Sequence, residues 1–291
     1  MVVAIYPALL TTIVCLRLWP SSGCKPLLNF WDLLIKDESR EPVTVALEIY
    51  SVWFFFYSFM YLLTYDEPQR SLFRPFKFHK NYPDHSLVVK EFLRSVKGVG
   101  VAAIYSIIVN KLYFHNVLPS IYVPKLLILS ELKELRVAHF FAGLAVFAWA
   151  DFHFYWTHRL FHTKWLYKTF HKCHHESYNP DLFSAMSFHW FESCIYFSSA
   201  LLVSWILPLW TFRLLIIGLI IFPLEDHLGH GTWSLESSHN HYIHHSKFNW
   251  NYGSSPLWDH LMGTIRENNG SMSDREKEAI QQAKLANCKL E

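Results

Sequence analysis

The chain has 291 residues, of which 52% are apolar and only 17% are charged. Soluble domains carry about 25% charged residues, so this composition is unusual for a free cytosolic protein, and the 18% aromatic content excludes a disordered chain. The 26 basic and 24 acidic residues leave a formal net charge of +2, which gives no support for binding to nucleic acid through its phosphates.

Five apolar stretches are candidates for membrane spans, each judged against the roughly 20 residues that a spanning helix needs. They are Met1–Leu16, Val43–Tyr65, Val96–Leu118, Val137–Trp156 and Ser193–Leu224. The last stretch is too short for two full spans, but it fits a helical hairpin that enters the membrane and returns. We therefore expect an all-α, multi-span membrane protein rather than a soluble protein with a very apolar core.

The distribution of basic residues predicts which side of the membrane each connecting segment faces. Segments 65–95 and 157–190 are rich in lysine and arginine, which is typical of cytoplasmic loops. The hairpin returns the chain to the side that it left, so the residues after Glu225 are expected on that side too. The histidine-rich part of the chain is thus predicted to gather at the cytoplasmic face.

Histidine is the residue type with the most uneven distribution along the chain. Of the 18 histidines, 13 lie between His153 and His245, and eight of these form three clusters. On a helix, residues three or four apart share a face, so each cluster is expected to present two or three imidazoles in one direction. Neutral imidazole is the commonest metal ligand, and eight imidazoles exceed the four ligands of a zinc site. The clusters are His158 and His162; His171, His174 and His175; and His241, His244 and His245.

These spacings predict a polynuclear histidine site without selecting the metal, because imidazole binds zinc, copper, iron and nickel. The sequence has no H-E-x-x-H motif, so a zinc protease has no support. A metal-dependent enzyme and a histidine-rich metal transporter both remain open. A transporter is expected to hold its polar ligands inside spans near the bilayer midplane. Here the clusters lie at span ends and in the segments beyond them, which favours the enzyme.

The clusters and their neighbours resemble the motifs of the fatty acid hydroxylase/sterol desaturase superfamily. The resemblance is carried by D-x-x-x-Y-x-x-H-R-x-x-H at 151–162, Y-K-x-x-H-K-x-H-H at 167–175 and N-W-N-Y-G at 249–253. Segments 225–229 and 244–251 are most similar to the cholesterol 25-hydroxylases of that superfamily. The similarity covers roughly residues 138–266, so we expect N-terminal spans with a basic loop at 1–137, a hydroxylase-like catalytic domain at 138–266, and a polar tail at 267–291.

The resemblance implies a di-iron, dioxygen-dependent monooxygenase of the endoplasmic reticulum membrane, with its active site facing the cytoplasm. It would hydroxylate a sterol or a related lipid taken from the bilayer; a sterol desaturase or a C-4 methylsterol oxidase is the alternative. The electrons would come from NADPH or NADH through a separate reductase or cytochrome b5. A separate donor is implied because the sequence has no His-Pro-Gly-Gly signature of a fused cytochrome b5 domain.

The resemblance also implies roles for individual residues, with Asp226 as the partner that orients an imidazole. Asn240 precedes His241 where the family usually has a second histidine, so His239, and likewise His189 and His230, are alternatives as further ligands. The same departure leaves open a catalytically inactive relative. The implied iron ligands are His158, His162, His171, His174, His175, His227, His241, His244 and His245.

Overall fold

The computed structural model describes residues 40–118, 137–230 and 237–266, except Pro68, Lys80 and Pro208. The predicted first span Met1–Leu16 and the predicted tail 267–291 lie outside these residues. Within the described residues the regular structure is helical. These residues form no β-sheet, and Lys77 and His230 form one isolated β-bridge. The all-α prediction is therefore confirmed for this part of the chain.

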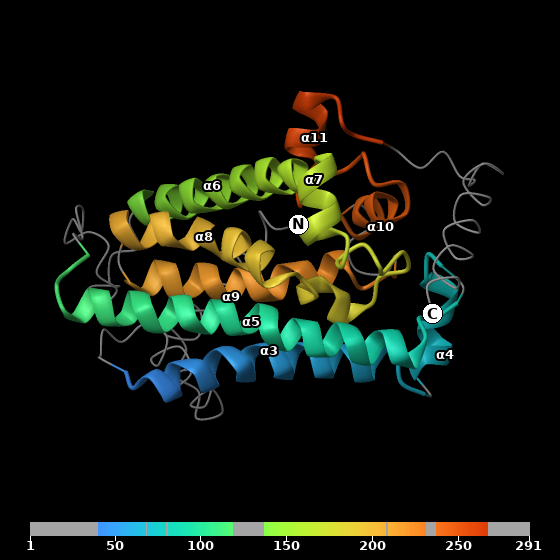
Figure 1. Ribbon diagram of the computed structural model, residues 1–291, viewed down its shortest axis with the longest axis horizontal. Coiled ribbons are helices and arrows are strands. Elements are labelled where there is room, and N and C mark those ends of the chain that lie inside the picture. Colours follow the sequence, from blue (N-terminus) through green and yellow to red (C-terminus); the bar gives the residue numbers. More distant parts are fainter. Residues whose placement is uncertain are drawn as a thin grey trace.

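Long helices that run in roughly the same direction form the body of the molecule (Figure 1). Helices α3 and α5 pack against each other, and the hairpin of α8 and α9 lies between α5 and α6. Short helices gather at one end, on the right in Figure 1, and this end holds the histidine clusters. The long helices are α3 (Pro42–Thr64), α5 (His85–Phe114), α6 (Val137–Phe161), α8 (Trp190–Ile206) and α9 (Leu209–Asp226). The shorter ones are α4 (Gln69–Phe73), η2 (Arg74–Phe76), α7 (Lys164–Leu166), the π-helix η5 (Tyr167–His171), the 3-10 helix η6 (Leu182–Met186), α10 (Ser237–Lys247) and α11 (Pro256–Met262).

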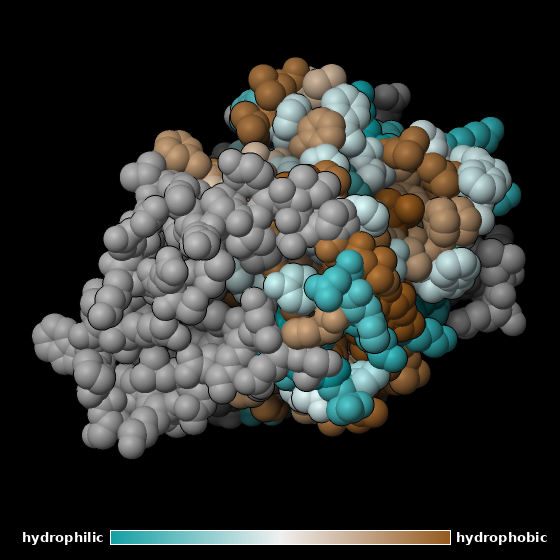
Figure 2. Space-filling view, turned by 90° about the vertical axis from the view of Figure 1, so that its left-hand side faces the viewer, coloured by the Kyte–Doolittle hydropathy of each residue, from teal (hydrophilic) through white to brown (hydrophobic). Residues whose placement is uncertain are grey.

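Helix α3 is buried on one side and exposed on the other. Ile49, Trp53 and Tyr57 follow each other at four-residue spacing and form part of the core, and the Tyr57 hydroxyl donates to the Ile220 carbonyl at 2.8 Å. The opposite face exposes large apolar side chains such as Leu47 and Phe55, which are 61% and 63% exposed. Figure 2 shows hydrophobic side chains on the described surface at the end of the molecule that is on the left in Figure 1.

Helices α3 and α5 are both long and apolar enough to cross a membrane. In the most apolar window of each helix, only 28% and 39% of the residues are buried. A core helix of a soluble protein buries most of its apolar residues, and soluble monomers rarely expose large apolar patches. The exposed faces of α3 and α5 are thus suited to contact with lipid.

Residues 85–95 are helical, so the prediction of a loop over 65–95 is wrong in its second part. Helix α5 begins directly after Asp84, which has an extended conformation, and runs without a break into the predicted span. The charged side chains of its first turns have partners outside the helix: the Glu176 carboxylate lies 2.8 Å from both Lys90 Nζ and Arg94 Nη1. Lys90 and Arg94 lie just before the apolar section of α5. Because both are paired with Glu176, their charges do not end the helix.

The last turns of α9 contain Pro223, which has no N–H to donate to the carbonyl four residues earlier. That carbonyl belongs to Leu219, and it accepts a hydrogen bond from the Tyr196 hydroxyl at 2.7 Å instead. The Pro223 carbonyl in turn accepts from the main-chain N–H of His227 at 3.1 Å and from its Nδ1 at 2.8 Å. The end of α9 thus fixes the orientation of the His227 ring.

Candidate metal centre

The nine histidines named from the sequence lie together where the ends of α6, α9 and α10 meet segment 171–175. They form two groups, and within each group the ligand nitrogens all lie within 4.8 Å of one another. All of them are buried except His162, which is partly exposed. The first group contains His158, His162, His171, His175 and His244; the second group contains His174, His227, His241 and His245.

Each histidine triplet presents two of its rings to one group and the third ring to the other group. In α10, His241 and His245 belong to the second group while His244 belongs to the first. On a helix, residues four apart differ by about 40° around the axis, whereas a residue three further on lies about 60° to the other side. The triplet at 171–175 divides in the complementary way, with only His174 in the second group. Each H-x-x-H-H motif therefore contributes to both groups.

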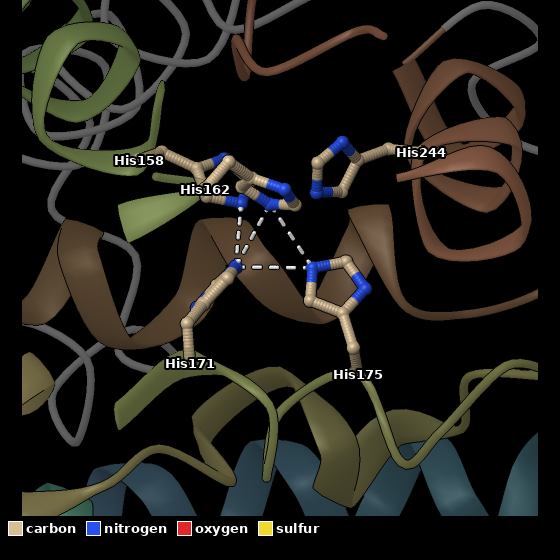
Figure 3. Close-up of side chains that lie close together, drawn as sticks. All are labelled: His158, His162, His171, His175 and His244. Carbon is tan, nitrogen blue, oxygen red and sulfur yellow. Dashed lines mark hydrogen bonds between the residues drawn. The ribbon is translucent and has the colours of Figure 1, made fainter. Parts of the chain in front are cut away.

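The Nε2 atoms within each group converge on a common point. In the first group, His171 Nε2 lies 3.2 Å from that of His158, 3.1 Å from that of His162 and 3.0 Å from that of His175 (Figure 3). In the second group, His227 Nε2 lies 3.1 and 3.2 Å from those of His241 and His245. Two nitrogens bound about 2.1 Å from one metal at a right angle are about 3.0 Å apart, against about 3.4 Å at a tetrahedral angle. The observed distances lie within this range, so the nitrogens of each group are close enough together to bind one metal ion.

Main-chain carbonyls fix the protonation of several rings. The Nδ1 atoms of His158 and His244 each lie 2.7 Å from a carbonyl oxygen, of Tyr252 and Trp250 respectively. A carbonyl only accepts hydrogen bonds, so each Nδ1 carries the proton, and the Nε2 of the neutral ring carries a lone pair. The same reasoning applies to His227, whose Nδ1 donates to the Pro223 carbonyl.

These tautomers make the donor set suited to bound cations. His171 Nδ1 lies 2.6 Å from the Glu192 carboxylate, so the Nε2 atoms of His158 and His171 face each other at 3.2 Å with lone pairs on both. Two lone pairs at this distance repel each other unless a cation lies between them. His244 Nε2 is buried and has no hydrogen-bond partner. A metal ion bound by the first group would satisfy these nitrogens.

Burial lowers the pKa of all nine histidines. It lowers the pKa of His158 to about 4 and that of His227 to about 3. For the other seven, burial is again the larger cause, and the charges that neighbouring rings would carry lower the pKa further. The rings are therefore neutral at pH 7, which is the form that binds a metal ion.

The motif that follows α10 supports the carbonyls that orient His158 and His244. Asp259 accepts from the main-chain N–H groups of Tyr252 and Gly253 at 2.9 and 2.8 Å. The Asn251 side chain donates to the Asn240 carbonyl and bonds both main-chain groups of Arg266. These contacts fix the loop that carries the Trp250 and Tyr252 carbonyls. The residues of this motif thus act on the imidazoles through the main chain.

Sequence reasoning missed Glu192, the carboxylate in contact with His171. It lies in the first turn of α8, directly before the apolar stretch predicted as a hairpin, and burial raises its pKa well above the usual range. An acidic residue at the edge of such a stretch was the available signal. Asp226, which was predicted to orient an imidazole, is also buried and lines the cavity next to the histidines. Its role as an imidazole partner stays a prediction.

Three other histidines considered as ligands lie outside both groups. His189 precedes α8, where its Nδ1 accepts from the Phe191 N–H at 3.2 Å. His230 donates from Nδ1 to the Leu228 carbonyl at 2.6 Å. The His239 ring packs 5.0 Å from that of Phe78. His239 therefore does not join the second group in place of a histidine at position 240.

An apolar cavity between α6, α8 and α9 reaches histidines of both groups. Its walls include Phe154, Phe188 and Leu219. Its described lining residues contain no lysine or arginine but several carboxylates, which are those of Asp151, Glu192, Glu225 and Asp226. The histidines at its surface are His158, His171, His174, His227 and His241. A lipid in this cavity would therefore contact the site that the two groups form.

Comparison with known proteins relates this region to lipid-modifying enzymes. Residues 143–264 match the profile of the fatty acid hydroxylase family. The chain is 32% identical over 135 residues to a probable Δ7-sterol 5(6)-desaturase of Neurospora crassa, which covers 44% of this chain and 39% of that protein. It is 32% identical over 150 residues to a very-long-chain aldehyde decarbonylase of Oryza sativa subsp. japonica, covering 46% of this chain and 56% of that protein.

A shorter match of higher identity links the chain to methylsterol monooxygenase 2-1 of Arabidopsis thaliana. The identity is 63% over 30 residues, which are 10% of this chain and 11% of that protein. The chain thus spans about two fifths of the length of the Neurospora relative and less than two thirds of the others. No solved structure matches the chain.

Proposed function

Residues 143–264 belong to the fatty acid hydroxylase family, and on this premise we propose that the protein is a membrane-bound oxidoreductase that oxidises a sterol or a related lipid with dioxygen. The observation that carries the proposal is the pair of neutral histidine groups at the surface of an apolar cavity. His158, His162, His171, His175 and His244 would hold one iron, and His174, His227, His241 and His245 the other. Two irons bound there would supply the activation of dioxygen.

The protein's own residues bind and orient the lipid beside this site. The aromatic and aliphatic walls exclude water from the reacting carbon, and their shape decides which carbon lies next to the histidines. Glu192 and the carbonyls of Tyr252, Trp250 and Pro223 keep the proton on Nδ1 of the histidine that each contacts. The Nε2 atom of that ring therefore stays available to the metal.

The charges around the cavity support a sterol rather than a free fatty acid as the substrate. Four carboxylates and no cationic side chain are among its described lining residues. The hydroxyl group of a sterol can donate a hydrogen bond to one of these carboxyl groups, whereas the carboxylate of a fatty acid finds no lysine or arginine among the described lining residues. Glu225 offers such an acceptor, because its buried Oε1 has no hydrogen-bond partner.

Hydroxylation is the proposed reaction, with desaturation and C-4 methyl oxidation as the alternatives. The finer proposal of a cholesterol 25-hydroxylase-like activity rests on segments 225–229 and 244–251. The desaturase and the methylsterol monooxygenase among the relatives support the alternatives. The mass of the product separates these outcomes, as described below.

We propose that the enzyme spans the endoplasmic reticulum membrane several times, with the histidine groups facing the cytoplasm. The apolar faces of α3 and α5 support the spans. The exposed residues Lys164, Lys168 and Lys172 flank the histidines at 171–175 and support the orientation. A separate reductase or cytochrome b5 would deliver electrons from NADPH or NADH at this face. The division into segments 1–137, 138–266 and 267–291 is likewise a proposal.

The proposal is tested by lipid analysis of cells that are supplied with sterol and express the full chain. The matched variants are His174→Ala/His175→Ala, which removes one ring from each group, and His260→Ala, which removes an exposed histidine outside both groups. We expect a sterol one oxygen heavier in cells with the unchanged chain or the His260→Ala variant. The double variant should lose this product and bound iron together.

A product two hydrogens lighter would identify a desaturase, and oxidation of a methyl group at C-4 would identify a methylsterol oxidase. The enzyme proposal fails if the purified chain holds iron, receives electrons from an active reductase and changes no lipid. Metal flux across the membrane under those conditions would support the transporter instead.

A further inference from the structure

A second cavity lies among α3, α5 and α9 and shares no lining residue with the cavity at the histidines. It is lined by the first half of α3, the later part of α5 and the first half of α9, including Val45, Phe212 and Ile217. His227 lies beyond the other end of α9, and the 18 residues of that helix span about 27 Å. The second cavity is therefore distinct from the proposed catalytic cavity.

Two uncharged polar side chains in this cavity have no hydrogen-bond partner. Ser106 and Asn110 lie one turn apart on α5 and are only 7% and 4% exposed. The Ser106 Oγ and the Asn110 Oδ1 are both buried without a partner. Buried polar atoms in native proteins are nearly always satisfied, by the protein, by water or by a ligand. Both side chains line the cavity, so a group inside it would supply the missing hydrogen bonds.

The charges of Arg40 and Glu48 at this cavity offset each other. Arg40 Nη1 and the Glu48 carboxylate form an ion pair at 2.6 Å, with side chains only 8% and 21% exposed. Arg40 Nη2 and Glu48 Oε1 remain buried without a hydrogen-bond partner, while Arg213, which also lines the cavity, has interactions of its own. This demand is met by a group without net charge that both donates, as to the Asn110 and Glu48 oxygens, and accepts, as from the Ser106 hydroxyl and Arg40 Nη2. A hydroxyl group does both, whereas a carboxylate or a phosphate diester only accepts.

We propose that this cavity binds an uncharged membrane lipid that carries a hydroxyl group, held by Ser106 and Asn110. Most of the remaining lining is apolar and comes from helices suited to contact with lipid, so the body of the ligand lies against α3 and α9. The hydroxyl group could belong to a sterol or to a diacylglycerol. In either case the ligand stabilises the folded chain and stays remote from the oxidation site.

The test measures lipid binding to the purified, metal-loaded full chain in detergent. The probe is the fluorescent sterol dehydroergosterol, followed by energy transfer from tryptophan, with dioleoylglycerol and oleate as competitors. Leu219→Trp fills the cavity at the histidines and leaves the second cavity to be measured alone. In this background we expect saturable binding that Asn110→Leu weakens at least tenfold. Ser204→Ala, a buried serine outside both cavities, should leave it unchanged.

Displacement by dioleoylglycerol but not by oleate would identify an acylglycerol, and displacement by neither would identify a sterol. The proposal is overturned if the Leu219→Trp chain binds neither lipid alcohol, because water or another part of the chain then fills the cavity. It is also overturned if oleate competes equally well, or if Asn110→Leu binds normally. Should Asn110→Leu fail to fold, Ile217→Trp fills the same cavity from α9 and must abolish binding. A failure of the catalytic proposal would leave this measurement unaffected.

Discussion

At the scale of single residues, the candidate metal centre depends on what lies behind each imidazole. His171 donates to Glu192, while His158, His244 and His227 donate to main-chain carbonyls. Each partner selects one tautomer and directs the remaining nitrogen to the centre of its group. A carboxyl group, that of Glu192, stands behind only one of these four rings, so its loss should affect the first group.

We expect Glu192→Ala to lower the affinity of the first group for a metal ion about 10- to 100-fold, because His171 loses the partner that orients it. Glu192→Gln should lose less, since its amide oxygen still accepts from Nδ1. Metal content after dialysis against buffers of fixed free metal concentration measures the effect. Glu67→Gln, on the exposed surface, is the control. Equal metal retention by Glu192→Ala and the unchanged chain would contradict the proposed role.

The stability of the metal-free protein should fall as the pH drops from about 6.5 to about 4. An unfolded histidine has a pKa near 6.5, whereas burial lowers that of folded His158 to about 4, so in this range the unfolded state binds more protons. At pH 5 this difference amounts to about 2 kcal/mol for one such residue. Thermal unfolding in detergent at several pH values measures the slope of stability against pH.

The slope should decrease in His227→Asn, because the pKa of His227 is lowered to about 3 by the same burial. The exposed His260 serves as the control position, and His260→Asn should leave the slope unchanged. A stability that does not vary between pH 7 and pH 5 would show that the rings are not buried in neutral form.

At the scale of elements, two irregular helix segments assemble the centre. The π-helix η5 precedes the turn that carries His174 and His175, and Pro223 interrupts the hydrogen bonding of α9 before His227. Irregular turns of this kind occur frequently at functional sites. At Pro223 the Tyr196 hydroxyl replaces the missing helical donor, which couples α8 to α9 at the level of the histidines.

This coupling is testable by a double-mutant cycle. Tyr196→Phe should cost about 1–3 kcal/mol, because the buried Leu219 carbonyl loses its donor. In a Pro223→Ala background the alanine N–H can donate to that carbonyl, so the same change should cost about 1 kcal/mol less. Chemical unfolding of the four proteins gives the coupling energy. Strict additivity would show that the hydroxyl does not stand in for the missing N–H.

At the scale of the whole molecule, the histidine groups lie at one end of the helical bundle. Helices α3 and α5 extend from this end to the other (Figure 1), and both are apolar enough to cross a membrane. Exposed lysines flank the histidines, whereas the later part of α5 ends at the opposite side. This polarity is the physical basis for the proposed orientation in the membrane.

The orientation predicts which positions a membrane-impermeant thiol reagent modifies. In cells with a permeabilised plasma membrane and an intact endoplasmic reticulum, we expect labelling of Lys168→Cys at the histidine end. Val117→Cys, which is 57% exposed after α5, should be labelled only after the internal membrane is opened. The unchanged chain gives the background from its own cysteines. The reverse pattern would place the histidines in the lumen.

The sequence by itself determined the helical class, two of the helices suited to span a membrane, and the nine histidines that come together. The helices and the eight clustered histidines follow from composition and spacing, because apolar runs of sufficient length form helices and clustered imidazoles have few structural uses; His227 followed from the family resemblance. The start of α5 at His85 was not predicted in this way, since residues 85–95 precede the apolar section and carry charged side chains, of which Lys90 and Arg94 pair with Glu176.

Only the tertiary structure decided how the histidines divide into two groups, and that Glu192 orients one of them. His244, in α10, and His174, in the turn after η5, each belong to the group opposite to that of the other two histidines of their triplet. The partners of the rings come from distant segments, as with His158 and the Tyr252 carbonyl. Such contacts depend on where the helices end and how they pack, which local spacing does not encode.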